Sequence, residues 1–199
     1  MPHGRKSTRK RDNDGRMKFF WLVLGAISVS ACLNPGGRET SADKGANRND
    51  LILVQRLLSH GNVHARLLEI CKSRAMHDEL KQDCAKSLDY TLERNNRLRN
   101  WQTQWSASSG TIAPMIHDKD TVLFSQLSDI QGEVFDQAVL HALVLHAHEG
   151  LTEADACNKQ AKHSDLKLFC AQLHPNFHRA LDAVAKWRCS WFGSCSSAE

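Results

Sequence analysis

The feature that most constrains this chain is an internal repeat with an offset of 86 positions. Residues 50–105, moved forward by that offset, fall on residues 136–191 without a gap, and twelve of the 56 aligned residues are identical. The identical pairs are Asp50/Asp136, Leu57/Leu143, His60/His146, Cys71/Cys157, Ala75/Ala161, His77/His163, Leu80/Leu166, Lys81/Lys167, Cys84/Cys170, Ala85/Ala171, Trp101/Trp187 and Trp105/Trp191. Paired cysteines, tryptophans and histidines rarely coincide by accident. We therefore interpret the chain as one structural unit written twice.

Each copy has the pattern of helix, tight turn and helix. Apolar residues recur at steps of three and four on both sides of a turn near residues 75–78, and the second copy repeats this pattern. No stretch has convincing strand alternation. One hairpin cannot cover its own apolar stripe, so the sequence predicts an all-α fold, a four-helix bundle of two repeated antiparallel helical hairpins. A short apolar piece, 123–130, is expected to pack across the bundle end as a short helix.

The first 31 residues have the composition of a secretory signal. They contain seven Lys or Arg and two Asp, and residues 19–31 form an uncharged apolar run. In a helix with a rise of ~1.5 Å per residue such a run covers about 20 Å, less than a hydrocarbon core of ~30 Å. A cleaved signal is therefore favoured over a permanent transmembrane helix. Translation can begin at Met1 or at Met17, and both starts remain open.

The end of this signal resembles a bacterial lipobox, Val29-Ser30-Ala31-Cys32. By that resemblance Cys32 is lipidated and becomes the first mature residue; the alternative is an ordinary cleavage site that happens to precede a cysteine. Residues 32–49 are polar and predict a flexible tether. Leu33 after the cysteine resembles the signal for transfer to an outer membrane. We expect a periplasm-facing lipoprotein held by its lipid, at the outer rather than the inner membrane.

The rest of the chain divides into a first hairpin repeat at 50–105, a linker at 106–122 and a second repeat at 123–199 with a C-terminal disulfide loop. Outside the signal there are 19 basic and 20 acidic residues. Nucleic-acid binding requires a basic face on the folded domain. The charge balance therefore predicts that nucleic acid is not a partner, whereas an envelope protein remains a candidate partner.

Six cysteines remain after Cys32, and export places them in an oxidising compartment. Cys71 and Cys84 flank the first turn on inward faces, Cys157 and Cys170 repeat that arrangement, and Cys189 and Cys195 can close a small terminal loop. We predict these three disulfide bonds. A thiol metal site usually has two cysteines separated by two residues, and the sequence contains no such spacing.

Two groups of residues are candidate metal ligands. The first is His60 with His146, which occupy equivalent inward positions and would meet if the hairpins pack with twofold symmetry. Neutral imidazole is a good ligand for copper or zinc. The alternative is a pair of core histidines that form hydrogen bonds with their neighbours.

The second group belongs to the second copy alone. If Cys157 faces Cys170, Glu149 lies opposite His178 and Glu153 lies opposite His174, at positions where the first copy has apolar residues. Burying these four groups unpaired is costly, and a bound cation would offset that cost. The alternative is a solvated charged seam.

The motifs of several enzyme classes are absent from the sequence. It contains no Glu-x-x-His of the di-iron bundles, no His-Glu-x-x-His, no Gly-x-Ser-x-Gly, no glycine-rich phosphate loop and no haem-attachment motif. We therefore predict that the protein is not an enzyme.

The second copy resembles an exported ferritin-like family, domain of unknown function 305, and more distantly family 4142. The resemblance covers residues 123–192, and residues 50–105 match the same pattern more weakly. It rests on a Gly-x-x-Phe-Asp start at 132–136, histidines in the middle of the helix, and a later helix that ends in tryptophan. This chain has His146-Ala-His148 where the family has adjacent histidines, and it lacks the family's methionines. The resemblance implies a periplasmic helical bundle, and some members are associated with copper handling.

The sequence leaves two functions open. The leading hypothesis is a lipoprotein that binds a metal ion, copper before zinc, for storage or resistance. The second is a structural or interaction lipoprotein of the cell envelope without a metal, whose histidines serve packing and the surface.

Overall fold

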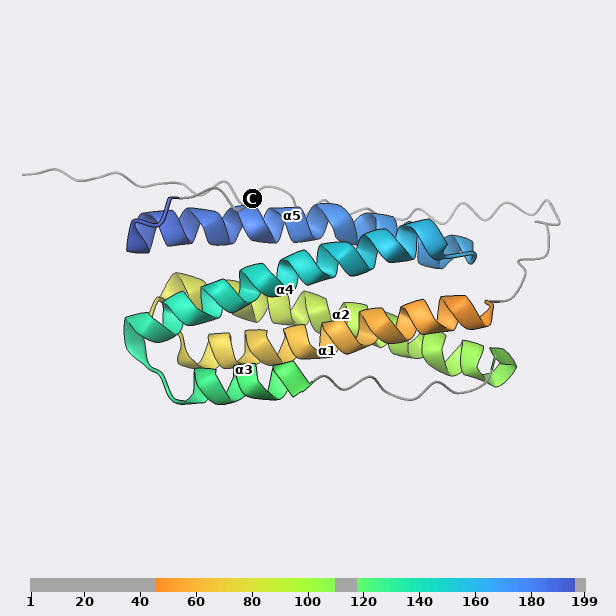
Figure 1. Ribbon diagram of the computed structural model, residues 1–199, viewed down its shortest axis with the longest axis horizontal. Helices are drawn as coiled ribbons and strands as arrows, with labels where there is room; N and C mark the ends of the chain where they lie inside the picture. The colour runs from red at the N-terminus through yellow and green to blue at the C-terminus, as the bar shows by residue number, and fades with distance from the viewer. Residues whose placement is uncertain (1–45, 110–117, 196–199) are drawn as a thin grey trace, which may run out of the picture. The chain divides into compact units, whose positions relative to one another are not determined.

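The computed structural model describes residues 46–109 and 118–195. The predicted signal peptide, Cys32 and the tether up to residue 45 lie outside this part of the chain. Its regular elements are five helices: α1 (Arg48–Arg74), α2 (Asp78–Ser109), α3 (Asp118–Ser128), α4 (Gly132–Gln160) and α5 (Ser164–Phe192) (Figure 1). None of the described helices combines the length and the apolarity that crossing a membrane requires.

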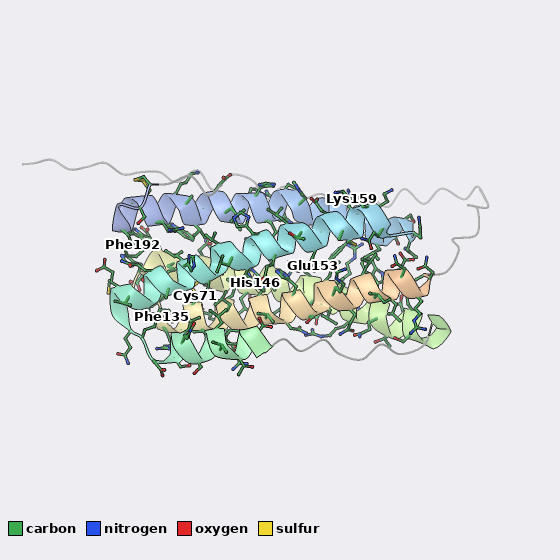
Figure 2. All side chains as sticks on the ribbon, viewed as in Figure 1. Cys71, Phe135, His146, Glu153, Lys159 and Phe192 are labelled. Atoms are coloured by element: carbon green, nitrogen blue, oxygen red, sulfur yellow. A yellow bond between two sulfur atoms is a disulfide. The ribbon has the colours of Figure 1, made fainter. Side chains whose placement is uncertain are left out.

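The four long helices form the predicted all-α bundle from two antiparallel hairpins. Helix α1 packs along α2, and α4 packs along α5, while the two hairpins meet chiefly where α1 lies against α4 (Figure 1). The shorter α3 packs against α4. One continuous core fills the bundle, and its largest fully buried side chains are Phe135, Leu51, Leu53, Leu67, Leu80, Leu98, Leu127, Leu140 and Leu166. Side chains of all four long helices are drawn in Figure 2.

The helices extend further than the sequence pattern suggested. Helix α2 continues past Trp105 to Ser109, and α3 begins at Asp118, within the predicted linker and five residues before the expected short helix. The four residues at 106–109 are small, and none of them is a glycine or a proline. Because nothing in that segment breaks a helix, α2 continues until the position before Gly110.

The three predicted disulfide bonds are present. Cys71–Cys84 and Cys157–Cys170 join the two helices of each hairpin next to its turn, with Cα–Cα distances of 6.0 Å and 5.8 Å. Cys189–Cys195 closes the C-terminal loop. Each of the first two bonds fixes the helix ends that carry one turn.

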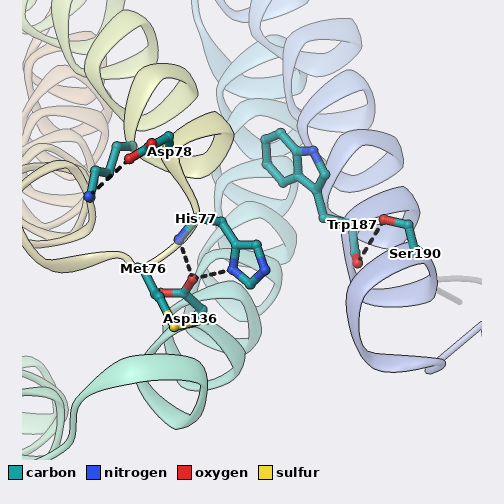
Figure 3. Close-up of polar contacts among 7 residues, drawn as sticks. Met76, His77, Asp78, Asp136, Trp187 and Ser190 are labelled. Atoms are coloured by element: carbon teal, nitrogen blue, oxygen red, sulfur yellow. Dashed lines mark hydrogen bonds and ion pairs between the residues drawn. The ribbon is translucent and has the colours of Figure 1, made fainter. Parts of the chain in front are cut away.

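A buried aspartate at the start of each hairpin binds the turn of the other hairpin. The Asp136 carboxylate accepts hydrogen bonds from the backbone N–H groups of Met76 (2.8 Å) and His77 (3.0 Å) and contacts His77 Nδ1 at 2.6 Å (Figure 3). At the equivalent positions, Asp50 accepts from the backbone N–H groups of Lys162 (2.7 Å) and His163 (3.3 Å). The exchange is reciprocal, so these contacts hold the hairpins in one register.

Trp105 and Trp191, at equivalent positions of the two hairpins, occupy matching environments. The Trp191 ring stacks on the His77 ring with centroids 4.2 Å apart, and the Trp105 ring lies 4.8 Å from the His163 ring. Trp191 and Asp136, both in the second hairpin, therefore contact the same turn residue of the first hairpin, His77. Trp105 and Asp50 of the first hairpin contact His163 of the second in the same way.

Candidate metal centre

Two histidines face each other where α1 meets α4. The rings of His60 on α1 and His146 on α4 are stacked, with centroids 3.9 Å apart and planes at 6°. His60 Nε2 lies 2.9 Å from the backbone carbonyl oxygen of His146, and His146 Nε2 lies 3.1 Å from that of His60. His146 is marked near the middle of α4 in Figure 2. The structure therefore brings together the pair that the repeat predicted would meet.

These two hydrogen bonds determine which nitrogen of each ring carries the proton. A carbonyl oxygen can only accept, so each Nε2 must donate an N–H. In a neutral imidazole the other nitrogen is then unprotonated. Both rings consequently have their lone pair at Nδ1, the atom through which each could bind a metal ion.

A carboxylate lies next to this pair. Glu149, one turn after His146 on α4, has Oε2 3.7 Å from His146 Nδ1. His60, His146 and Glu149 each offer a ligand atom, and these atoms lie within 4.8 Å of one another. Over residues 46–109 and 118–195, no other three His, Cys, Asp or Glu residues form such a group.

Burial keeps His146 in its neutral form near pH 7. The residue is 6% exposed, and desolvation is the main cause that lowers the pKa of His146 below its ordinary value. The hydrogen bond with the His60 backbone and the charges of Glu149 and Asp120 act in the opposite direction, while Arg94 adds to the lowering. A neutral imidazole does not have to lose a proton before it binds a metal ion.

A third histidine lies beside the pair and was missed in the sequence analysis. His64, one turn after His60 on α1, stacks at 5.2 Å from the His146 ring and 6.3 Å from the His60 ring. Its Nδ1 is buried and has no hydrogen-bond partner. Burial, followed by the charges of His146, Arg94 and His60, holds the pKa of His64 well below its ordinary value. The available signal was the spacing of four residues from His60, which places both rings on one face.

The second copy has no counterpart of His64. The equivalent residue is Gly150, where a Cβ atom would lie 2.4 Å from Phe177 Cζ and 2.9 Å from His60 Cε1. The Phe177 ring meets the His60 ring edge-on, with centroids 5.7 Å apart. The glycine thus makes room for the aromatic ring that closes this side of the histidine cluster.

The buried guanidinium of Arg94 lies near the histidine cluster. Arg94 on α2 is 8% exposed, and burial lowers the pKa of Arg94 to about 10. Its Nη2 has no hydrogen-bond partner, and within the described residues no carboxylate forms an ion pair with it. Its aromatic neighbour is Phe177, whose ring centroid lies 5.9 Å away. Arg94 therefore keeps a positive charge in the interior near His64 and His146.

The second predicted group is not assembled as expected. Glu153 forms an ion pair with Arg56 of α1 (2.8 Å), while His174 lies 3.6 Å from Asp155 and its ring lies 4.6 Å from that of His178. Glu149 joins His60 and His146 instead. The prediction considered only contacts inside the second hairpin. Because α4 packs against α1 as well as α5, its acidic side chains find partners on the other hairpin.

Fold and site together define a disulfide-linked, all-α bundle of the ferritin-like class with a histidine cluster between its hairpins. No family model matches the sequence, and no curated protein matches it. Solved structures share its fold. CopM in the Cu(II)-bound form has a TM-score of 0.63 at 13% identity, covering 74% of this chain and 99% of CopM, and CopM in the Ag-bound form has 0.60 at 16%, covering 72% and 98%. A DUF305 protein from Streptomyces coelicolor, described as secreted, has 0.62 at 14%, covering 69% and 89%.

Proposed function

We propose that this protein binds a metal ion, copper before zinc, between its two hairpins through His60, His146 and Glu149. The observation that carries the proposal is the reciprocal pair of Nε2–H···O=C bonds, because it leaves both lone pairs at Nδ1 while a carboxylate lies 3.7 Å from one of them. Imidazole nitrogen with a carboxylate oxygen is a donor set that suits copper, which such sites bind more tightly than other divalent first-row metals.

The structural neighbours support copper or silver as the ion. CopM has been crystallised in Cu(I)-bound, Cu(II)-bound and Ag-bound forms, and it has the same fold at low identity. Zinc is not among the ions of these forms. The donor atoms of this chain, rather than the likeness of fold, support a site between α1 and α4.

The proposed setting is the cell envelope. The signal-like residues 1–31 and the lipobox-like residues 29–32 support a mature lipoprotein anchored through Cys32, with the bundle on a polar tether facing the periplasm, at the outer membrane. A bundle held there would take up copper outside the cytoplasm, which is the basis for a role in storage or resistance.

A metal titration tests the proposal. Cu²⁺ and Ag⁺ are titrated without any thiol reductant, so that the disulfides stay formed, in a Cys32→Ser background that removes the one cysteine outside the disulfides. We expect binding that weakens at least about tenfold in His146→Gln and His60→Gln. His141→Gln, at an exposed position of α4, is the matched control and should bind like the parent. Equal binding by all four proteins would contradict the proposed site.

One observation also favours the second function, a structural or interaction lipoprotein. The hydrogen bonds between His60 and His146 join the hairpins directly and would stabilise the bundle without any ion. Elemental analysis of untagged protein purified from the periplasm separates the two. Stoichiometric copper supports the metal function, whereas metal-free protein with no Cu²⁺ or Ag⁺ affinity supports the structural one.

A further inference from the structure

The cluster between the hairpins contains more than the three residues of the proposed site. His64 adds a third imidazole from the same face of α1 as His60, and its ring is within 14° of parallel to the His60 ring and within 9° of parallel to the His146 ring. Its Nδ1 is a buried polar atom without a hydrogen-bond partner. Buried polar atoms nearly always have a partner, so an unpaired one in this position points to a ligand.

We propose that His64 is the third imidazole ligand of this site. This inference rests on the proposed metal function. The first hairpin would supply two imidazoles, and the second hairpin one imidazole and the Glu149 carboxylate. His64 lies outside the compact group of His60, His146 and Glu149, so binding through it requires its ring to move toward them.

The proposal is tested with His64→Ala and His64→Gln in the Cys32→Ser protein with its disulfides formed. Both should weaken Ag⁺ binding about tenfold, while His141→Ala leaves it unchanged. Circular dichroism confirms that each variant is folded. If His146→Gln abolishes Ag⁺ binding and the His64 variants match the parent, this inference fails and the proposed function stands. If His146→Gln also matches the parent, the proposed function fails as well.

Discussion

Replacing Asp136 by alanine should weaken the bundle more than any surface change on α4. The carboxylate is fully buried and accepts hydrogen bonds from two backbone N–H groups of the opposite turn, those of Met76 and His77. Alanine can accept neither. The contact with His77 Nδ1 is lost too, although that side chain is 27% exposed and can bind water instead.

The magnitude follows from the donors left without a partner. A buried group that loses its hydrogen-bond partner costs about 1–3 kcal/mol, and two such donors give about 2–6 kcal/mol. The turn is partly exposed, since Met76 is 52% exposed, so water can reach part of it and the lower half of this range applies. We expect the free energy of unfolding to fall by about 2–4 kcal/mol, which for a domain of this size lowers Tm by roughly 5–15 °C.

Urea unfolding followed by circular dichroism measures this change. Asp50→Ala, at the equivalent position, should have an effect of similar size, because Asp50 accepts from the backbone N–H groups of Lys162 and His163. Glu133→Ala, an exposed acidic residue in the first turn of α4, is the control and should change stability by less than about 0.5 kcal/mol. If Asp136→Ala costs no more than Glu133→Ala, the reasoning about the reciprocal turns is refuted.

Three further predictions concern the core. Gly150→Ala should destabilise the protein by about 1–3 kcal/mol in urea unfolding, because the added Cβ would lie 2.4 Å from a packed ring; a neutral change would contradict the close packing. The pKa values of His64 and His146 are lower in the folded protein than their ordinary value of 6.5. As the pH falls from 7.5 to 5.5, the unfolded chain therefore binds more protons than the folded protein does, and the free energy of unfolding should decrease. His64→Gln should flatten that profile, and an unchanged slope would refute the assignment. The double variant Cys71→Ser/Cys84→Ser should lose about 3 kcal/mol, and peptide mapping of the parent that found Cys71 linked to Cys157 would contradict the hairpin pairing.

The elements that the sequence predicted correctly are those whose causes are local or repeated. Helical periodicity and the cysteine spacing depend on residues close in the chain, and both appear in the structure as predicted. The contact between His60 and His146 was predictable because equivalent positions of two similar hairpins meet when the hairpins pack face to face. The repeat supplied the long-range information that a single helix pattern lacks.

The contacts that could not be predicted from the sequence are those set by how the two hairpins cross. His64 has no histidine counterpart in the second copy, so the repeat gave no signal for it. Glu153 was assigned to its own hairpin, yet Arg56 of α1 lies within reach and forms the ion pair. Arg94 gave no signal at all, because a lone arginine on a helix usually points to solvent.

The central claim is that a metal ion binds between the hairpins through Nδ1 of His60 and His146, and histidine ¹⁵N NMR tests it most directly. On addition of Ag⁺ to the Cys32→Ser protein, we predict that the Nδ1 resonances of both residues shift, while both Nε2 atoms keep their protons and their bonds to the opposite carbonyl oxygen. Unshifted Nδ1 resonances in the presence of saturating Ag⁺, or shifts confined to exposed residues such as His141, would contradict the claim.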